Sequence, residues 1–308
     1  MKLEGLMFDR MKEAVRRSVR TILKMEERFD DLRIMHGRMA ADLNRAKTSK
    51  QLQDYEFKVF SQWGEDGILQ RLIDCIEIKN RTFIEFGVED FYESNCRYLM
   101  VNNNWSGFVL DGSQSNINRL RHSYFYWRHQ LDAASSFITR NNINQLLASS
   151  GFDRDLGILS IDIDGVDYHV FEAITEFNPR ILILEYNAVF GSERKITVPY
   201  ADNFRRTRSH YSNLYFGASL AALTQLANRK GYTLVGTTSA GVNAFFIRND
   251  LMNDSFEPHT AASAFTASRA RESRDQQGNL TFLGGDDRIA LIRGLPVYNV
   301  ETERTEAL

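Results

Sequence analysis

The stretch LGILSIDIDGVDYHVFEAI, residues 156–174, carries the pattern that decides the fold. Its first part is a continuous apolar run with the length of a buried parallel strand, and its last part has the apolar spacing of a helix. Three acids, Asp162, Asp164 and Asp167, lie in the turn between the two parts. The stretch therefore predicts a strand–loop–helix unit with carboxylates at the carboxyl end of its strand.

The same alternation of strands and helices continues on both sides of this unit. The further strand signals lie at residues 81–87, 105–113, 126–131, 180–187, 232–238 and 242–250. Strands that alternate with helices predict a doubly wound, mostly parallel α/β sheet. The last two strands are joined by the short turn SAG and add an antiparallel hairpin at one edge. We therefore expect a Rossmann-like fold that binds ligands beyond the carboxyl ends of its strands.

The first 50 residues differ from the rest and predict a helical extension. Mostly apolar residues recur there at alternating spacings of four and three: Met11, Val15, Ser18, Ile22, Met25, Phe29, Leu32, His36, Met39 and Leu43. This spacing predicts a coiled coil that joins copies of the chain into a homo-oligomer. The alternative is a single amphipathic helix packed on the rest of the chain. Residues 51–308 would then form the Rossmann-like domain.

The end of the chain, residues 259–308, is expected to form a lid or tail of that domain. It carries five arginines, for which two roles are possible: Arg269, Arg271, Arg274, Arg288 and Arg293. They either bind a phosphorylated or acidic substrate or pair with acids of the domain itself. We favour the second role.

Composition excludes several classes of protein. The formal net charge is −2, whereas a nucleic-acid-binding surface usually shows a basic excess. Cys75 and Cys96 stand in no metal-ligand spacing and give no disulfide framework. No window approaches the roughly 20 apolar residues of a membrane span. We expect a cytoplasmic protein that binds no nucleic acid.

The loop after the first strand indicates which cofactor the fold can take. In FIEFGVEDFYESN, residues 83–95, Glu85 and Gly87 resemble the acid-x-Gly opening of a loop that binds S-adenosylmethionine (SAM). Glu89 and Phe91 stand where the next glycines are usual. A nicotinamide cofactor needs those glycines around its pyrophosphate, whereas SAM has no phosphate. The loop therefore favours SAM over NAD, with the loss of any cofactor as the alternative.

The second strand ends in Asp111, which is followed by Gly112 and Ser113. An acid at this place is where a Rossmann-type fold binds ribose, because a carboxylate accepts two hydrogen bonds from a vicinal diol. The alternative is an aspartate that only starts the turn DGS. We expect a cofactor site formed by these three residues together with Glu85 and Gly87.

Six blocks of the sequence resemble, in order, a bacterial group of SAM-dependent methyltransferases related to the FkbM-like methyltransferases. The blocks are SQWGEDGIL, FIEFGVEDFYESN, NWSGFVLDGS, SIDIDGVDYHVFEAI, ILILEYN and GASLAALTQLANRKGYTLVG. The resemblance covers about residues 57–300 and leaves out the N-terminal helix. It implies a class I methyltransferase fold, SAM at Glu85, Gly87 and Asp111, and chemistry at the end of the fourth strand. Members of this group often occur among functions of surface-polysaccharide biosynthesis.

Strand periodicity brings several acids to the carboxyl end of the sheet. Asp162 and Asp164 end the fourth strand, and Glu185 and Asn187 end the neighbouring fifth strand. Buried carboxylates that lie close together need compensation. A divalent cation, with Mg²⁺ as the natural choice, would supply it at Asp162, Asp164 and Glu185. A shared proton, a neighbouring arginine or helix N–H groups are the other ways.

Two kinds of chemistry fit this cluster. A bound metal would hold a sugar diol and lower the pKa of the attacking hydroxyl. Without a metal, Asp162 or His210 would act as the general base. We predict a SAM-dependent O-methyltransferase that acts on a sugar hydroxyl of a glycan or glycolipid precursor. A non-catalytic scaffold assembled through residues 1–50 is the main alternative. A metal-dependent hydrolase is a third, but the sequence has no recognisable nucleophile motif.

Overall fold

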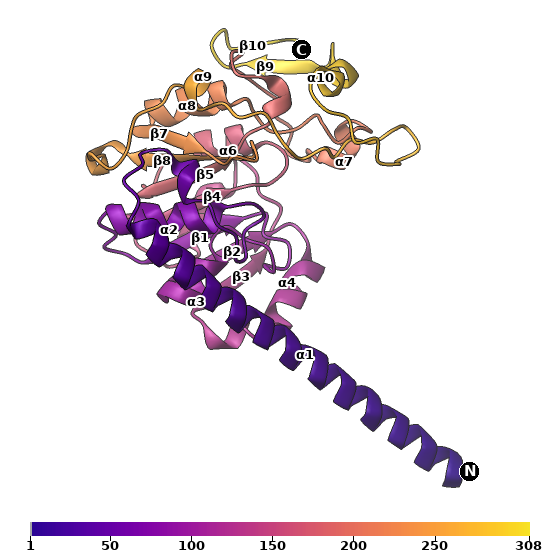
Figure 1. Cartoon of the computed structure of the whole chain (residues 1–308). Helices are drawn as coiled ribbons and strands as arrows, with labels where there is room; N and C mark the ends of the chain where they lie inside the picture. Colours follow the sequence, from indigo (N-terminus) through magenta and orange to yellow (C-terminus); the bar gives the residue numbers. More distant parts are fainter. Residues whose placement is uncertain (1) are drawn as a thin grey trace.

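A seven-stranded sheet lies at the centre of the computed structural model, which describes residues 2–308 (Figure 1). Its strand order is β3-β2-β1-β4-β5-β8-β7. The bounds are β1 Thr82–Phe86, β2 Ser106–Asp111, β3 Leu131–Ser135, β4 Ile158–Ile161, β5 Ile181–Glu185, β7 Tyr232–Thr237 and β8 Asn243–Arg248. The first five strands are parallel, and β8 is antiparallel to both of its neighbours. The expected mostly parallel Rossmann-like sheet with a terminal antiparallel hairpin is confirmed.

One strand was misplaced by the sequence pattern. The expected strand at residues 126–131 is mostly the short helix η2 (Tyr126–Arg128), and β3 begins only at Leu131. The aromatic run that suggested a strand forms the turn between α4 and β3. Of its aromatic side chains, Phe125 is fully buried, whereas Tyr124 and Tyr126 are half-buried and Trp127 is exposed.

Helices cover both faces of the sheet. One face packs against α2 (Glu65–Cys75), α3 (Arg97–Asn103) and α4 (Gln114–His122). The other packs against α5 (Ile143–Ala148), α6 (Asp167–Ala173) and α8 (Leu220–Arg229). All four residues of β4 are buried, as expected for a strand covered on both faces. The order reverses between β1 and β4, and a Rossmann-like sheet opens a crevice at such a point.

The remaining elements are short helices and a second, smaller sheet. A small sheet has the order β10-β9-β6 and joins the loop after β5 to the end of the chain. The bounds are η1 Leu52–Tyr55, η3 Ala188–Phe190, β6 Ile196–Thr197, α7 Arg206–Ser209, η4 Asn249–Leu251, α9 Ala261–Ala264, α10 Asp286–Ile292, β9 Pro296–Asn299 and β10 Arg304–Ala307. Among the described residues, no helix is both long and apolar enough to cross a membrane.

Helix α1 (Lys2–Arg45) extends far beyond the domain, and its second half lies along α2 and α3 (Figure 1). The face in contact with the domain contains Asp30, Ile34, Gly37 and Ala41. Gly37 permits this close approach, since a Cβ atom there would lie 2.6 Å from a methyl group of Val59. The helix is therefore attached through small and polar residues rather than through its apolar seam.

A buried ion pair fixes α1 to the domain. The guanidinium of Arg97 donates to Asp30 at 2.6 Å and lies 4.0 Å from the ring centroids of Phe60 and Phe125. Tyr124 also donates a hydrogen bond to Asp30. Detaching α1 would leave the buried guanidinium of Arg97 without its carboxylate partner, which costs free energy. The second half of α1 therefore belongs to the domain.

The apolar seam of α1 faces away from the domain. Its side chains Met25, Phe29, Leu32, Met39 and Leu43 are each more than half exposed, as are Met11 and Ile22. The alternative, a helix packed on the rest of the chain, is met by the second half of α1, although the packed face is not the apolar seam. The side chain of Val15, also part of the expected seam, lies outside the described residues. The coiled coil itself stays a prediction.

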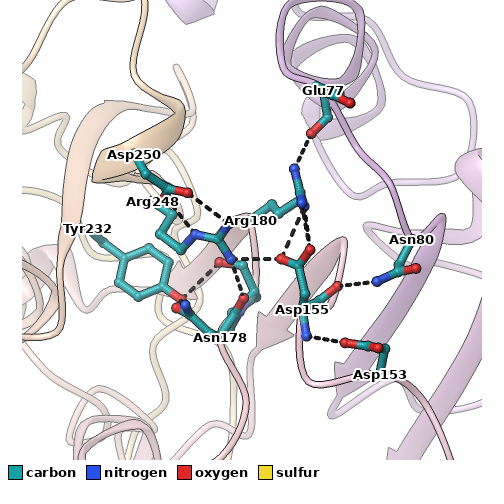
Figure 2. Close-up of polar contacts among 10 residues, drawn as sticks. Glu77, Asn80, Asp153, Asp155, Asn178, Arg180, Tyr232, Arg248 and Asp250 are labelled. Carbon is teal, nitrogen blue, oxygen red and sulfur yellow. Dashed lines mark hydrogen bonds and ion pairs between the residues drawn. The ribbon is translucent and has the colours of Figure 1, made fainter.

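An ion-pair network joins the strands at the end of the sheet opposite the crevice (Figure 2). Asp155, just before β4, accepts hydrogen bonds from Arg180 at 3.1 Å and from Arg248 at 2.8 Å. Arg180 also donates to the backbone oxygen of Glu77, and Arg248 pairs with Asp250. Burial raises the pKa of Asp155, but the hydrogen bonds from the two arginines outweigh it and lower that pKa below its ordinary value. This network holds β4, β5 and β8 in register.

Candidate functional site

A cavity of about 580 Å³ opens at the carboxyl ends of β1, β2, β4 and β5. This volume lies in the range of pockets that hold small-molecule ligands. The predicted site residues that line it are Glu85, Gly87, Asp111, Gly112, Asp162, Asp164 and Glu185. The structure therefore brings seven of the nine candidate residues to one cavity; Ser113 and His210 are not among its lining residues.

The loop after β1 keeps a glycine-type backbone although two of its glycines are absent. Gly87 has φ = 73°, Glu89 has φ = 48° and Phe91 has φ = 64°. A Cβ atom on Gly87 would lie 1.6 Å from the backbone oxygen of Asp162, so only glycine fits there. Phe91 is fully buried and stacked on Phe83, and this burial offsets the cost of its left-handed conformation. The sequence suggested that this loop had lost its usual glycines. The backbone nevertheless has positive φ angles, as glycines would allow, at Glu89 and Phe91.

Glu85 lies in the lining of the cavity, and both of its carboxylate oxygens accept hydrogen bonds from the protein. It accepts hydrogen bonds from Ser94 Oγ at 2.6 Å, Asn95 N–H at 2.8 Å and Cys96 N–H at 3.1 Å. Burial raises the pKa of Glu85, and these hydrogen bonds oppose the rise. The side chain thus fixes the loop that leads into α3, and shapes the cavity through that loop.

Asp111 joins three segments at the other end of the cavity. It accepts hydrogen bonds from Glu89 N–H at 2.9 Å, Ser113 N–H at 2.7 Å and Asn116 Nδ2 at 3.0 Å. A carboxylate offers about four acceptor positions, so one remains for a ligand hydroxyl. Ser113 caps α4 by accepting from Asn116 N–H. Its expected cofactor role stays a prediction beside this capping role.

The acidic cluster forms as the strand pattern predicted. Ser160 of β4 is paired with Ile183 of β5, and continuing this register places Asp162 opposite Glu185. Carboxylate oxygens of Asp162, Asp164 and Glu185 lie within 4.8 Å of one another. Asn187 is absent from the group, because its amide donates to the backbone oxygens of Leu214 and Phe216. The expectation that Asn187 joins the cluster is wrong.

Electrostatics favour protonation in this cluster. Burial raises the pKa of Asp162 well above its ordinary value, and the charges of Asp164 and Asp167 add to the rise. Burial likewise raises the pKa of Glu185, followed by the charges of Asp162 and Asp164. The carboxyl groups of Asp162 and Glu185 face each other, with oxygens of the two groups within 4.8 Å. The pair is therefore suited to hold one proton in a shared position.

Asp167 has a different task from its two neighbours. It begins α6, is fully buried, and accepts hydrogen bonds from Ile163 N–H at 2.8 Å and Gly165 N–H at 2.9 Å. These bonds fix the loop that carries Asp164, whose φ is 52°. The expected charge at the helix start is thus also the anchor of the acidic loop.

Arg206 of α7 provides the positive charge next to the cluster. It forms an ion pair with Asp164, donates to Asn213 O at 2.7 Å and lies 4.0 Å from the ring centroid of Phe216. Its second guanidinium nitrogen is 3.3 Å from Glu272. Sequence reasoning allowed a neighbouring arginine but could not name it, because the long loop after β5 has no strand or helix period.

His210 lies away from the acids. Its Nδ1 is 2.8 Å from Ser212 Oγ, and its ring rests against Tyr211 with centroids 4.2 Å apart. His210 is not among the residues that line the cavity, whereas Arg206 of the short helix α7 is, and the role of His210 as a base stays a prediction.

Two apolar residues in the cavity were missed by the sequence reasoning. Phe137 and Ile138 follow β3 and line the cavity together with Gly112. A Cβ atom on Gly112 would lie 3.9 Å from the ring of Phe137. The rule that ligands bind beyond strand ends would have pointed to them if β3 had been placed correctly.

No family model and no curated protein matches the chain. Among solved structures, it is similar to a SAM-dependent methyltransferase from Clostridium acetobutylicum (8% identity, TM-score 0.38, covering 69% of this chain and 97% of that one). An O-methyltransferase from Bacillus cereus in complex with SAH shows 13% identity and a TM-score of 0.35, covering 54% and 72%. An O-methyltransferase family protein from Burkholderia thailandensis shows 9% and 0.36, covering 62% and 52%. At these values we transfer no residue role from them.

Proposed function

We propose that the protein is a SAM-dependent methyltransferase whose acceptor is a sugar hydroxyl of a glycan or glycolipid precursor. One observation carries the proposal: a single cavity joins a carboxylate suited to ribose, Asp111, to the proton-sharing pair of Asp162 and Glu185. The order of the sequence blocks that resemble FkbM-like methyltransferases supports the acceptor class. The two ends of the cavity would then serve cofactor and acceptor.

The residues at the first end fit SAM. Asp111 has one acceptor position left for a ribose hydroxyl, Phe137 offers an aromatic face for the adenine ring, and the cavity continues past Gly87, where the amino-acid part would lie. When bound, SAM supplies an electrophilic methyl group. The protein contributes the position of the acceptor and a base for its proton.

Asp162 is the proposed base. A carboxylate with a raised pKa is a stronger base than an ordinary one and is better matched to a proton acceptor at neutral pH. Glu185 would share the accepted proton, and Arg206 would limit the charge at Asp164. The acceptor proton would thus remain in the cluster until the product leaves.

The cluster also fits a divalent cation. Three carboxylates provide the hard oxygen ligands that Mg²⁺ prefers, and adjacent ligands of that ion lie about 3 Å apart. The oxygens lie within 4.8 Å of one another, so a small inward movement completes the arrangement. As the alternative to a shared proton, Asp162, Asp164 and Glu185 would together hold Mg²⁺, which would orient a sugar diol and make its hydroxyl more acidic.

We further propose that α1 joins copies of the chain into a homo-oligomer. Its exposed apolar residues recur at coiled-coil spacing between Met11 and Leu43, with Ser18 and His36 as polar positions, and a second copy offers the same pattern. We also propose a cytoplasmic location, and the free thiols of Cys75 and Cys96 support it, because free thiols are usual in reducing compartments.

Methyl transfer from SAM carrying a labelled methyl group into bacterial glycan precursors tests the function. The proposal expects label in a sugar ether with the wild type and none with Asp162→Asn. Label in no acceptor, together with a wild-type chain that only self-associates, would favour the scaffold alternative.

A further inference from the structure

Arg288, on α10, is a buried cation without a hydrogen-bond partner. Its side chain is only 8% exposed, and its Nε has no partner. In the described part of the chain, no group accepts a hydrogen bond from its guanidinium. Burial of an unpaired charge is costly, so buried arginines in proteins are almost always paired.

The other deeply buried arginines of this chain follow that rule. Arg97 is 1% exposed and pairs with Asp30. Arg180 is 4% exposed and donates to Asp155 and to the backbone oxygen of Glu77 (Figure 2). Both hold distant segments together. Arg288 has the burial of a structural arginine but none of its bonds, so packing alone does not account for it.

The surroundings of Arg288 carry an excess of positive charge. Arg206 and Arg274 each approach Glu272 to 3.3 Å, one at each carboxylate oxygen. Burial lowers the pKa of Arg288 most, and the positive charge of Arg206 lowers it further. The negative charge of Glu272 raises this pKa. Three guanidiniums therefore surround one carboxylate. Of the five arginines near the end of the chain, only Arg274 pairs with an acid of the described residues, which overturns the expectation that all would.

This cluster lies beside two cavities. Arg206 and Glu272 line the main cavity on its acidic side. Arg274 lines a second cavity of about 270 Å³ together with Tyr211, Leu283 and Leu291. Leu291 stands three residues after Arg288, which places both on one face of α10. Arg288 itself lines neither cavity, so a ligand group would reach it past Arg206 and Glu272, which line the main cavity, or past Arg274 and Leu291, which line the second.

We propose that Arg288, supported by Arg206 and Arg274, binds a phosphate group carried by the acceptor. Guanidinium groups bind phosphate through paired hydrogen bonds, and a dianion would satisfy the unpaired charge that the chain leaves buried. The assignment of this phosphate to the acceptor rests on the proposed methyltransferase function. The anion site itself does not, and it makes the acceptor a phosphorylated sugar or a sugar linked to phosphate.

The site is tested with inorganic phosphate and pyrophosphate, using sodium chloride at equal ionic strength as the salt control. The variants are Arg288→Met, Arg288→Lys and, as a matched control, Arg293→Met, which removes an exposed arginine next to the same helix. Calorimetric titration and thermal unfolding are measured for the full chain. We expect wild type and Arg293→Met to bind both anions and to melt at higher temperature with them.

Arg288→Met is expected to weaken anion binding by about tenfold or more, and Arg288→Lys to retain part of it. Without anion, Arg288→Met should melt at or above the wild-type temperature, because an unpaired buried charge has been removed. A wild type that ignores both anions overturns the proposal. So does an Arg288→Met variant that binds them like the wild type, or one that melts far lower while Arg288→Lys does not.

SAM titration of the same variants separates the two proposals. Arg288→Met should bind SAM like the wild type. If no variant binds SAM but the anion response of the wild type depends on Arg288, the methyltransferase proposal fails and the phosphate site stands.

Discussion

Asp162 and Glu185 stand opposite each other at the ends of two neighbouring parallel strands, with carboxylate oxygens within 4.8 Å of each other. The position follows from strand register alone. The chemistry follows from burial, which raises the pKa of both groups so that one proton is held between them. This pair is the centre of the proposed mechanism.

Replacing the base should abolish turnover without unfolding the protein. Asp162→Asn keeps the shape of the side chain but cannot accept the acceptor proton, so we expect the rate of methyl transfer to fall by about 100-fold or more. Thermal stability should stay equal or rise, since repulsion in the cluster decreases. Asp167→Ala is the control: it removes two hydrogen bonds from the loop and should lower the melting temperature. Unchanged turnover in Asp162→Asn would refute the assignment of the base.

Magnesium should stabilise the wild type through the same cluster. A ligand at ten times its dissociation constant stabilises by about 1.4 kcal/mol. We expect this increase in thermal unfolding with magnesium chloride and its loss in Asp164→Asn and Glu185→Gln. Glu272→Gln, which also contacts Arg206 but lies outside the cluster, should respond like the wild type. An equal response in all four proteins would show that the ion binds elsewhere.

Asp66 gives a pH dependence that is independent of the site. Its Oδ2 accepts from the backbone N–H groups of Val59, Phe60 and Ser61, while Oδ1 is buried without a partner. Burial raises its pKa from 3.8 to about 6 despite these bonds. The folded state therefore binds the proton more tightly than the unfolded state. The free energy of unfolding should fall as pH rises from about 4 to about 6, and the loss is complete above that range.

Asp66→Asn should make this slope shallower. The amide oxygen can keep the three backbone bonds, and the amide nitrogen can take the place of the unpartnered oxygen. Between pH 4.5 and pH 7.5, the free energy of unfolding measured with urea should fall less in Asp66→Asn than in the wild type. The expected difference is on the order of 2–3 kcal/mol. Asp167, whose pKa burial also raises to about 6, leaves part of the slope in place. A variant with the wild-type slope would show that titration of Asp66 does not produce it.

The seam of α1 should control self-association. The double variant Phe29→Glu and Leu32→Glu places charges in the exposed seam, and we expect it to convert an oligomer to a monomer in sedimentation experiments. Lys24→Glu is the control, because it adds an acid on the same helix outside the seam. The buried pair of Asp30 and Arg97 is untouched, so the domain should keep its stability. A wild type that is monomeric at micromolar concentration would remove the coiled-coil proposal.

The sequence predicted what depends on periodicity. The strands, the reversal of their order and the meeting of Asp162, Asp164 and Glu185 all follow from apolar runs and strand spacing. The role of Asn187 was wrong and His210 does not line the cavity, because both follow the end of β5 in a loop whose course depends on tertiary contacts. The apolar spacing of α1 was recognised in the sequence, and these residues are exposed. The face that attaches α1 to the domain includes Asp30, Gly37 and Ala41, which give no periodic apolar signal.

Other features could not be read because they depend on backbone shape or on distant segments. Glu89 and Phe91 looked like lost glycines, yet both keep positive φ angles, since burial of Phe91 and the bond from Glu89 to Asp111 hold the loop. Arg206 and Arg288 are far apart in the chain and meet only through the packing of α7 and α10 around Glu272.

Titration of SAM into the wild type and Asp111→Ala by calorimetry tests the central claim most directly. The wild type should bind one SAM per chain with a micromolar dissociation constant, and loss of the ribose partner at Asp111 should weaken binding by about tenfold or more. Gln114→Ala, an exposed change at the start of α4, should leave the affinity unchanged. Absence of heat and of any thermal shift with the wild type, or equal affinity in Asp111→Ala, would contradict the account.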